Sequence, residues 1–251
     1  MAQMCISLDQ WLKTPLGQHL LTRETAYFDS VVANVFGFNA VQIGHPELDL
    51  LRNCRIPQRF RVGLGGAVGV RADAGLLPFA SQSIDLVVIP HTLEFARHPH
   101  QVLREVERIL MPEGHLIVSG FNPRSFWGAR RWLKPDEDEF PWSGRFINLP
   151  RLKDWLSLLG FETQGGRMCC YVPPFRQQKW LQRFAFMEAA GDRWWAMGGG
   201  VYFIEAVKRV QGMRLITPNW REPASKSAAL APAARNVVNL NQYRKLKRTH
   251  E

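Results

Sequence analysis

The chain has 251 residues, of which 46% are hydrophobic and 22% are charged, and its formal net charge at pH 7 is +10. This size suits one well-buried α/β domain with extensions better than two separate cores. No apolar run approaches the ~20 residues that span a bilayer, and residues 1–10 lack the basic flank and long apolar core of a secretion signal. The sequence therefore predicts a cytoplasmic protein without a membrane span.

Residues 1–37 are predicted to form an N-terminal helical extension. Thr14 followed by Pro15 is typical of a helix start, with the hydroxyl capping the first turn and proline in the first helical position. Apolar residues then recur at helical spacing, and Gly37 is the predicted end of the helix.

Short apolar segments and helical segments alternate after residue 38. The predicted strands are 39–44, 59–65, 68–72, 84–90, 115–120, 161–172 and 200–209. The predicted helices are 46–54, one that begins at Pro99 and ends before Pro112, 149–160, and 176–190. Residues 121–150 are irregular and rich in proline and tryptophan. This alternation predicts an α/β domain, residues 38–216, with a mostly parallel seven-stranded sheet and an antiparallel strand at its edge.

Residues 217–251 are predicted to be a basic, disordered tail. They contain seven Lys or Arg against Glu222 and Glu251, which gives a net charge of +5, and they show little apolar periodicity. Such a tail could contact nucleic acid through its final basic residues, or it could simply be solvated and keep the protein in solution.

Cysteine and histidine spacing gives no prediction of a metal site. The four cysteines, Cys5, Cys54, Cys169 and Cys170, form no CxxC pair, so reduced thiols are expected. His98 and His100 have no acid or cysteine at ligand spacing.

Three residues stand at or just beyond the carboxyl ends of predicted strands: Gly44, Asp73 and His91. In parallel sheets these ends share one edge, where ligands bind. We therefore expect Asp73 and His91 on the same edge of the sheet, beside one crevice.

Residues 72–123 carry a specific resemblance. Asp73 precedes Leu-Pro-Phe at 77–79, and Ser83-Ile84-Asp85 opens the next strand. His-Thr-Leu-Glu follows at 91–94, and the helical pattern LREVERILMPEG follows at 103–114. In this order the segments resemble the type 11 group of class I S-adenosylmethionine-dependent methyltransferases. The resemblance implies a Rossmann-like fold, S-adenosyl-L-methionine as cofactor, and an unidentified methyl acceptor.

The resemblance also implies roles for particular residues. Asp73 matches the acid that accepts a hydrogen bond from the adenine amino group, and Ala74 would lie against the base. Pro90 and His91 match the loop that borders the methionine part and the acceptor, which makes His91 the candidate catalytic base. Gly44 matches the one glycine kept from the turn after the first strand.

The first half of the predicted domain departs from the family pattern. Gln42 stands where the family has an acid, and no acid matches the one that holds the ribose. About 30 residues separate Gly44 from Asp73, which indicates a lost or shortened helix. The glycine-rich segment 63–69 leads into a strand rather than a helix, which favours a tight connection over a cofactor loop. Weak cofactor binding is expected.

Three functions follow for the chain as a whole. It is predicted to be an S-adenosylmethionine-dependent methyltransferase; the alternatives are a catalytically inactive methyltransferase-fold binding or scaffold protein, and a nucleic-acid-associated protein acting through its tail. Trp127, Trp132 and Trp142 could line an acceptor pocket or pack in the protein.

Overall fold

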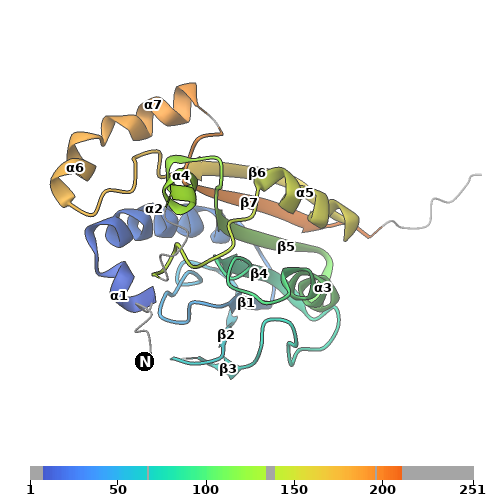
Figure 1. The fold of residues 1–251 in the computed structure, drawn as a ribbon. Helices are drawn as coiled ribbons and strands as arrows, with labels where there is room; N and C mark the ends of the chain where they lie inside the picture. Colours follow the sequence, from blue (N-terminus) through green and yellow to red (C-terminus); the bar gives the residue numbers. More distant parts are fainter. Residues whose placement is uncertain (1–7, 67, 134–138, 196, 211–251) are drawn as a thin grey trace, which may run out of the picture. The chain divides into compact units, whose positions relative to one another are not determined.

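The computed structural model describes residues 8–66, 68–133, 139–195 and 197–210, and within these ranges it has seven strands and seven helices (Figure 1). The strands are β1 (Asn39–Ile43), β2 (Gln58–Gly63), β3 (Val70–Arg71), β4 (Ile84–Pro90), β5 (Leu110–Phe121), β6 (Phe161–Cys169) and β7 (Val201–Lys208). The helices are α1 (Leu8–Leu12), α2 (Pro15–Val32), α3 (Pro99–Ile109), α4 (Phe126–Leu133), α5 (Leu149–Leu158), α6 (Gln178–Arg183) and α7 (Phe186–Trp194).

The strands form one sheet in the order β3-β2-β1-β4-β5-β7-β6. The first five strands in this order pair in parallel, whereas β7 runs antiparallel to both β5 and β6. The predicted seven-stranded, mostly parallel α/β sheet is therefore confirmed. The antiparallel strand lies one place in from the edge, because β6 pairs with its outer side.

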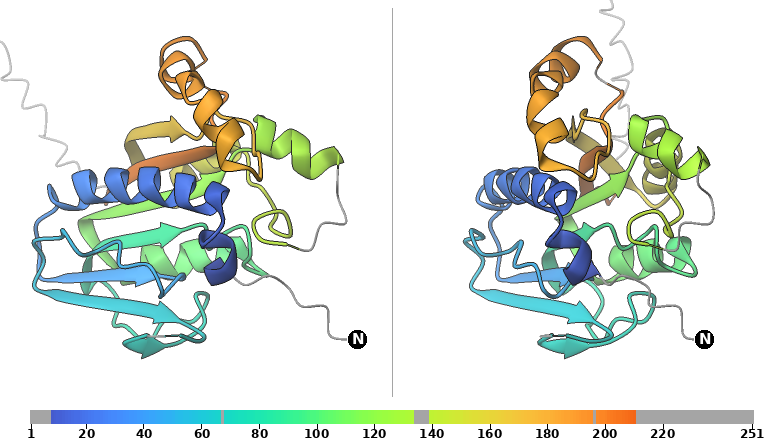
Figure 2. Two further views of the ribbon diagram at one scale, coloured as in Figure 1. Left: turned by 90° about the vertical axis from the view of Figure 1, so that its left-hand side faces the viewer. Right: turned by 60° about the vertical axis from the view of Figure 1, so that its left-hand side comes forward.

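Alternation along the strands divides the buried side chains between the two faces of the sheet. In β4, Leu86 and Val88 belong to one apolar cluster and Val87 and Ile89 to the other. Helix α2 covers the first face, and Figure 2 shows it running along the sheet. Helices α3 and α5 supply the second cluster. A sheet covered on both faces explains why β4 is a continuous apolar run.

Helix α2 begins where the sequence predicts and ends earlier. The Thr14 side chain accepts a hydrogen bond from the Gly17 N–H at 3.1 Å, with Pro15 in the first turn. The helix ends at Val32, so Gly37 is not its stop. A side chain at Gly37 would collide with the carboxylate of Asp85, which accepts hydrogen bonds from the backbone of the two following residues. Close approach to Asp85, rather than helix termination, explains this glycine.

The helix predicted for residues 46–54 is wrong, since that segment forms turns. Apart from residue 67, which lies outside the described residues, no helix occurs between β1 and α3. The short spacing from Gly44 to Asp73 thus corresponds to missing connecting helices, and β2 joins β3 through the glycine-rich segment alone.

The irregular segment between β5 and α5 contains the short helix α4. Trp127 and Trp142 are buried in the core, and the Trp127 indole donates a hydrogen bond to the Val172 carbonyl at 3.1 Å. Trp132 is 81% exposed. Two of the three tryptophans therefore pack inside the protein, and none of the three lines the pocket described below.

None of the helices in the described part of the chain is long and apolar enough to cross a membrane. The predicted tail, residues 217–251, lies outside the described residues, and the predicted division at residues 37 and 216 stays a prediction.

Candidate functional site

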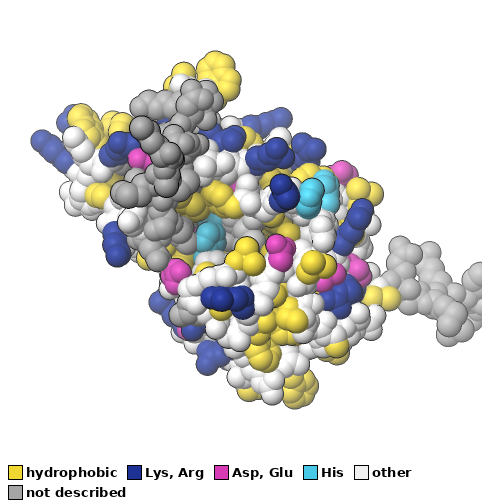
Figure 3. Space-filling model, turned by 60° about the horizontal axis from the view of Figure 1, so that its bottom comes forward, with side chains coloured by type: hydrophobic (Ala, Val, Ile, Leu, Met, Phe, Trp, Pro, Cys, Tyr) yellow, Lys and Arg dark blue, Asp and Glu magenta, His cyan; other side chains and the backbone are white. Residues whose placement is uncertain are grey.

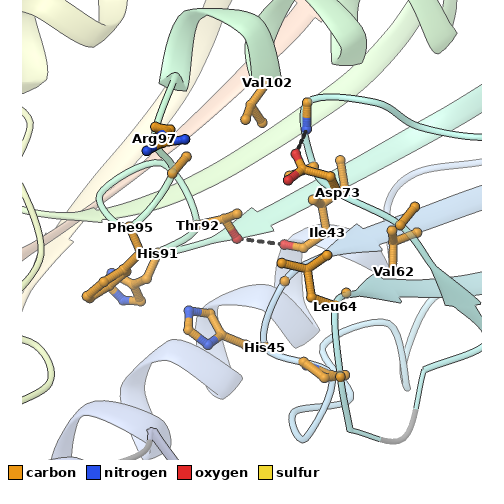
Figure 4. Close-up of a pocket in the computed structure, with 18 of the residues that line it drawn as sticks. Ile43, His45, Val62, Leu64, Asp73, His91, Thr92, Phe95, Arg97 and Val102 are labelled. Atoms are coloured by element: carbon orange, nitrogen blue, oxygen red, sulfur yellow. Dashed lines mark hydrogen bonds between the residues drawn. The ribbon is translucent and has the colours of Figure 1, made fainter. Parts of the chain in front are cut away.

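A pocket of about 780 Å³ lies at the carboxyl ends of β1 to β4 (Figure 4). From β1 the chain adds β2 and β3 outward on one side of the sheet, and it then crosses back to add β4 and β5 on the other side. The order of the strands therefore reverses between the neighbours β1 and β4. In open α/β sheets a crevice at such a reversal is the usual ligand site. The pocket therefore occupies the position that this topology favours for a ligand.

Four of the five residues predicted to contact cofactor line this pocket together. They are Gly44 after β1, Asp73 and Ala74 after β3, and His91 after β4. Pro90, the last residue of β4, is not a lining residue. Asp73 and His91 thus lie at the same edge of the sheet, as expected from the sequence.

Asp73 has one carboxylate oxygen engaged by its own turn. Its Oδ1 accepts a hydrogen bond from the Gly75 N–H at 2.7 Å, drawn as a dashed line in Figure 4. Within the described part of the chain, no donor bonds to Oδ2. The side chain is exposed and lines the pocket, so this second oxygen is available to a ligand donor.

Gly44 is required by its conformation and by a neighbour that sequence reasoning missed. Its φ is +82°, and a Cβ atom there would lie 2.2 Å from the Thr92 hydroxyl oxygen. The Thr92 hydroxyl lies 2.7 Å from the carbonyl oxygen of Ile43 and 2.9 Å from that of Pro90, so its single proton serves both. Thr92 therefore ties the end of β1 to the end of β4.

Gln42 stands where the family has an acid, and its side chain is fully buried. Its amide donates to the carbonyl of Leu48 at 2.7 Å and to that of His45 at 3.0 Å, and its Oε1 accepts from the Leu50 N–H at 3.0 Å. These bonds fold residues 44–50 into a turn against β1. The turn presents His45 and Glu47 to the pocket.

His91 lies between two buried carboxylates. Its Nε2 is 3.3 Å from Glu24 Oε1 of α2, and its Nδ1 is 3.5 Å from Glu94 Oε1. The ring stacks on Phe121 with centroids 4.0 Å apart. Glu24 also accepts a hydrogen bond from the Ser119 hydroxyl at 2.6 Å, and Glu94 accepts one from the Phe121 N–H at 2.7 Å.

Sequence reasoning missed Glu24, although the sequence carries a signal for it. The buried positions of α2 include Leu16, Leu20, Glu24, Phe28 and Val32, spaced four residues apart. A carboxylate in the middle of an apolar stripe needs a buried partner. The predicted strand-end His91 is that partner.

The charges of this cluster follow from burial and proximity. Burial alone would lower the pKa of His91, but Glu24 and Glu94 outweigh it and raise that pKa to about 10. Burial acts to raise the pKa of Glu24, but the charge of His91 and the hydrogen bond from Ser119 together act more strongly in the opposite direction. The pKa of Glu24 therefore lies below its ordinary value. Burial, helped by the nearby charge of His91, lowers the pKa of His45 to about 4. At neutral pH His91 is thus protonated and His45 is neutral.

Among the residues that the structure describes, two carboxylates line the pocket, Asp73 and Glu47. The end of β2, where the family has its ribose acid, is Gly63, followed by Leu64 and Gly65. This glycine-rich segment borders the pocket without leading into a helix, which agrees with a connection between strands. Both carboxylates are exposed, so each can accept hydrogen bonds from a ligand in the pocket. Within the described residues, no group of three His, Cys, Asp or Glu side chains is arranged to hold a metal ion.

Comparison with known proteins finds a matching domain family and several relatives. A family model described as "Methyltransferase domain" matches residues 23–118. The protein YafS of Escherichia coli K12 is 34% identical over 163 residues, which cover 64% of this chain and 68% of YafS. A malonyl-[acyl-carrier protein] O-methyltransferase of Methylovorus is 34% identical over 94 residues, 38% of this chain and 31% of that protein.

The fold also matches solved structures. An S-adenosylmethionine-dependent methyltransferase from Thermotoga maritima superposes with a TM-score of 0.59 at 19% identity, covering 80% of this chain and 94% of that one. Residues 23–118 therefore belong to the methyltransferase-domain family, the chain is a relative of YafS, and its fold is that of S-adenosylmethionine-dependent methyltransferases.

Proposed function

We propose that this chain transfers a methyl group from S-adenosylmethionine to an unidentified acceptor at the pocket formed by the ends of β1 to β4. The observation that carries the proposal is the gathering of Gly44, Asp73, Ala74 and His91 around one cavity at the reversal of strand order. S-adenosylmethionine, when bound, supplies a sulfonium methyl group that an acceptor nucleophile takes as the carbon–sulfur bond breaks and its electron pair stays on sulfur.

The protein's part in such a reaction is to align the reactants and exclude water. Asp73 Oδ2 would accept a hydrogen bond from the adenine amino group, and Ala74 would lie against the base. Glu47 would replace the missing ribose acid. Gly44 and Thr92, which join β1 to β4, would shape the end of the pocket that receives the methionine part.

The two histidines at this end would have different roles. The sequence predicts His91 as the catalytic base, yet a protonated imidazole has no lone pair with which to accept a proton. We assign His91 to holding the floor of the pocket between α2 and β4. His45 lines the pocket, and burial lowers its pKa to about 4, so its ring is neutral and it is the better candidate to accept a proton. Because His45 is a weak base, it suits an acceptor whose own proton is readily lost.

A methyltransferase-fold module without catalysis is the second candidate. The observation that favours it is the absence of a carboxylate at Gly63–Gly65, where the family holds the ribose. The two functions differ in whether a methyl group leaves the cofactor. A cytoplasmic location, and contact with nucleic acid through residues 217–251, stay predictions of the sequence.

The proposal is tested by calorimetric titration with S-adenosylhomocysteine. Asp73→Ala should weaken binding about tenfold to a hundredfold, because it removes a charge-assisted hydrogen bond worth roughly 1.5–3 kcal/mol. Asp154→Ala, at an exposed position on α5, is the matched control and should leave the affinity unchanged. Absence of heat at millimolar ligand, or equal affinity in Asp73→Ala, would contradict the proposal.

Glu47 gives a second, smaller prediction in the same assay. Glu47→Gln keeps the size of the side chain and removes its charge, and it should weaken S-adenosylhomocysteine binding roughly threefold to tenfold. Adenine alone has no ribose, so its affinity should be the same for Glu47→Gln and wild type. Equal losses for both ligands would place Glu47 away from the sugar.

A further inference from the structure

A second cavity, of about 720 Å³, lies beside the cofactor pocket and is lined by cationic side chains. Its lining contains Arg97, Arg104, Arg131, Arg145 and Arg151 together with His98 and His100, and it includes no Asp or Glu among the residues that the structure describes. We call this cavity the arginine groove. On the face drawn in Figure 3, Lys and Arg side chains gather beside histidines.

Among the described residues, no carboxylate forms an ion pair with the arginines of the groove. Elsewhere in the described part of the chain, arginines pair with carboxylates, as Arg108 does with Glu105 at 2.8 Å. Within that same part, Arg97, Arg104, Arg145 and Arg151 form no ion pair. Because these guanidinium groups have no carboxylate partner in the described part of the chain, an anion bound between them would gain charge-assisted hydrogen bonds.

Two arginines of the groove are held in place by uncharged groups. Arg131 Nε donates to the Trp142 carbonyl at 2.9 Å, and its guanidinium lies 5.3 Å from the centre of the Phe146 ring. Arg151 lies 5.2 Å from the centre of the Trp155 ring. These contacts fix the side chains without cancelling their charge, so the groove is partly preorganised for a ligand.

The backbone adds to the positive potential of the groove. The first turns of α3 and α5 both line it, through His100 and Gln101 in α3 and Arg151 in α5. Neither helix has a side-chain cap or an acidic residue in its first turn. The positive ends of two helix dipoles therefore act on the same cavity as the arginines.

The groove is adjacent to the site proposed for methyl transfer. Four residues line both cavities: Ala96, Arg97, His98 and Gln101, between β4 and the first turn of α3. A molecule held in the groove would reach the cofactor pocket across this shared border.

We propose that the arginine groove binds the anionic end of the methyl acceptor, a small molecule that carries phosphate or carboxylate groups. This inference rests on the proposed methyltransferase function and names the chemistry of its substrate. A cavity of this size suits a small ligand rather than a long polymer, and phosphate and carboxylate share the paired oxygens that guanidinium groups recognise.

The test measures anion binding separately from cofactor binding. Inorganic pyrophosphate and citrate are titrated into the full chain by calorimetry at constant ionic strength, with a single-stranded RNA dodecamer as a third probe. The test variant is Arg145→Ala/Arg151→Ala, at two exposed positions. The matched control is Arg183→Ala/Arg193→Ala, which removes the same charge from α6 and α7. S-adenosylhomocysteine is titrated into each protein as well.

The proposal predicts that pyrophosphate or citrate binds the wild type, and that its affinity for the test variant is lower by about tenfold or more. Its affinity for the control variant should lie within about twofold of the wild-type value. The stronger of the two probes identifies the anionic group. No binding by either anion, or equal loss in the control, would overturn the proposal; so would RNA binding that depends on Arg145 and Arg151 without binding of the small anions. S-adenosylhomocysteine affinity should be the same in all three proteins. Anion binding without S-adenosylhomocysteine binding would support the groove and sink the methyltransferase proposal alone.

Discussion

His91 lies buried between Glu24 and Glu94, and these carboxylates raise its pKa to about 10. These three residues come from α2, the end of β4 and the loop after it, so the cluster joins a helix to the floor of the pocket. A buried ion pair of this kind adds little net stability when intact, but loss of one partner leaves an uncompensated charge.

Single and double substitutions should separate these two effects. His91→Ala leaves two buried carboxylates without their cation, and we expect it to lower the free energy of unfolding by ~3–5 kcal/mol. Glu24→Gln/His91→Gln removes both opposite charges and should cost less than His91→Ala. Urea denaturation gives both values. A double variant that is less stable than His91→Ala would show that the pair matters for more than charge balance.

The pKa of His91 predicts how stability depends on pH. Because its folded pKa, about 10, lies above its ordinary value of 6.5, its stabilising contribution is complete below pH 6.5 and is lost as pH rises through 10. His45, with a folded pKa of about 4, contributes in the opposite direction: its share is present above pH 6.5 and is lost as pH falls towards 4. Unfolding free energies measured from pH 6.5 to 10 should fall for the wild type, and the fall should be shallower in Glu24→Gln/His91→Gln. Parallel curves would contradict the assignment of the charge.

At the scale of elements, β4 and α3 could be predicted from local pattern because their burial is simple. β4 is apolar throughout because both faces are covered, and α3 has one apolar face set by Val102, Leu103, Val106 and Ile109. The segment after β1 could not be predicted this way. Its apolar spacing resembles a short helix, but the buried side chain of Gln42 takes up its backbone groups and holds it as turns.

The junction of β1 and β4 yields a prediction about Gly44. Gly44→Ala places a Cβ atom against Thr92 in a left-handed conformation, and we expect a loss of ~1–3 kcal/mol in unfolding free energy and weaker S-adenosylhomocysteine binding. Thr92→Ala removes the hydroxyl with which the new Cβ collides. Gly44→Ala should therefore cost less stability when it is added to Thr92→Ala than when it is added to the wild type. Thermal melting with and without ligand measures both effects. An equal cost in both backgrounds would assign the whole cost to the backbone conformation.

At the scale of the molecule, the sequence placed Gly44, Asp73 and His91 at one edge because strand ends are local features and parallel strands share an edge. It missed Glu24, His45 and Thr92, whose roles depend on partners from other elements: Glu24 is 67 positions from His91, and Thr92 is 49 from Ile43. The arginine groove escaped for the same reason, since its residues come from three separate segments between 93 and 155.

The most direct test of the account is a crystal structure of the chain with S-adenosylhomocysteine. The account predicts the adenine amino group within hydrogen-bonding distance of Asp73 Oδ2, the ribose facing Glu47, and the homocysteine end beside Gly44 and Thr92. Ligand bound outside the pocket at the ends of β1 to β4, or with its adenine far from Asp73, would contradict it.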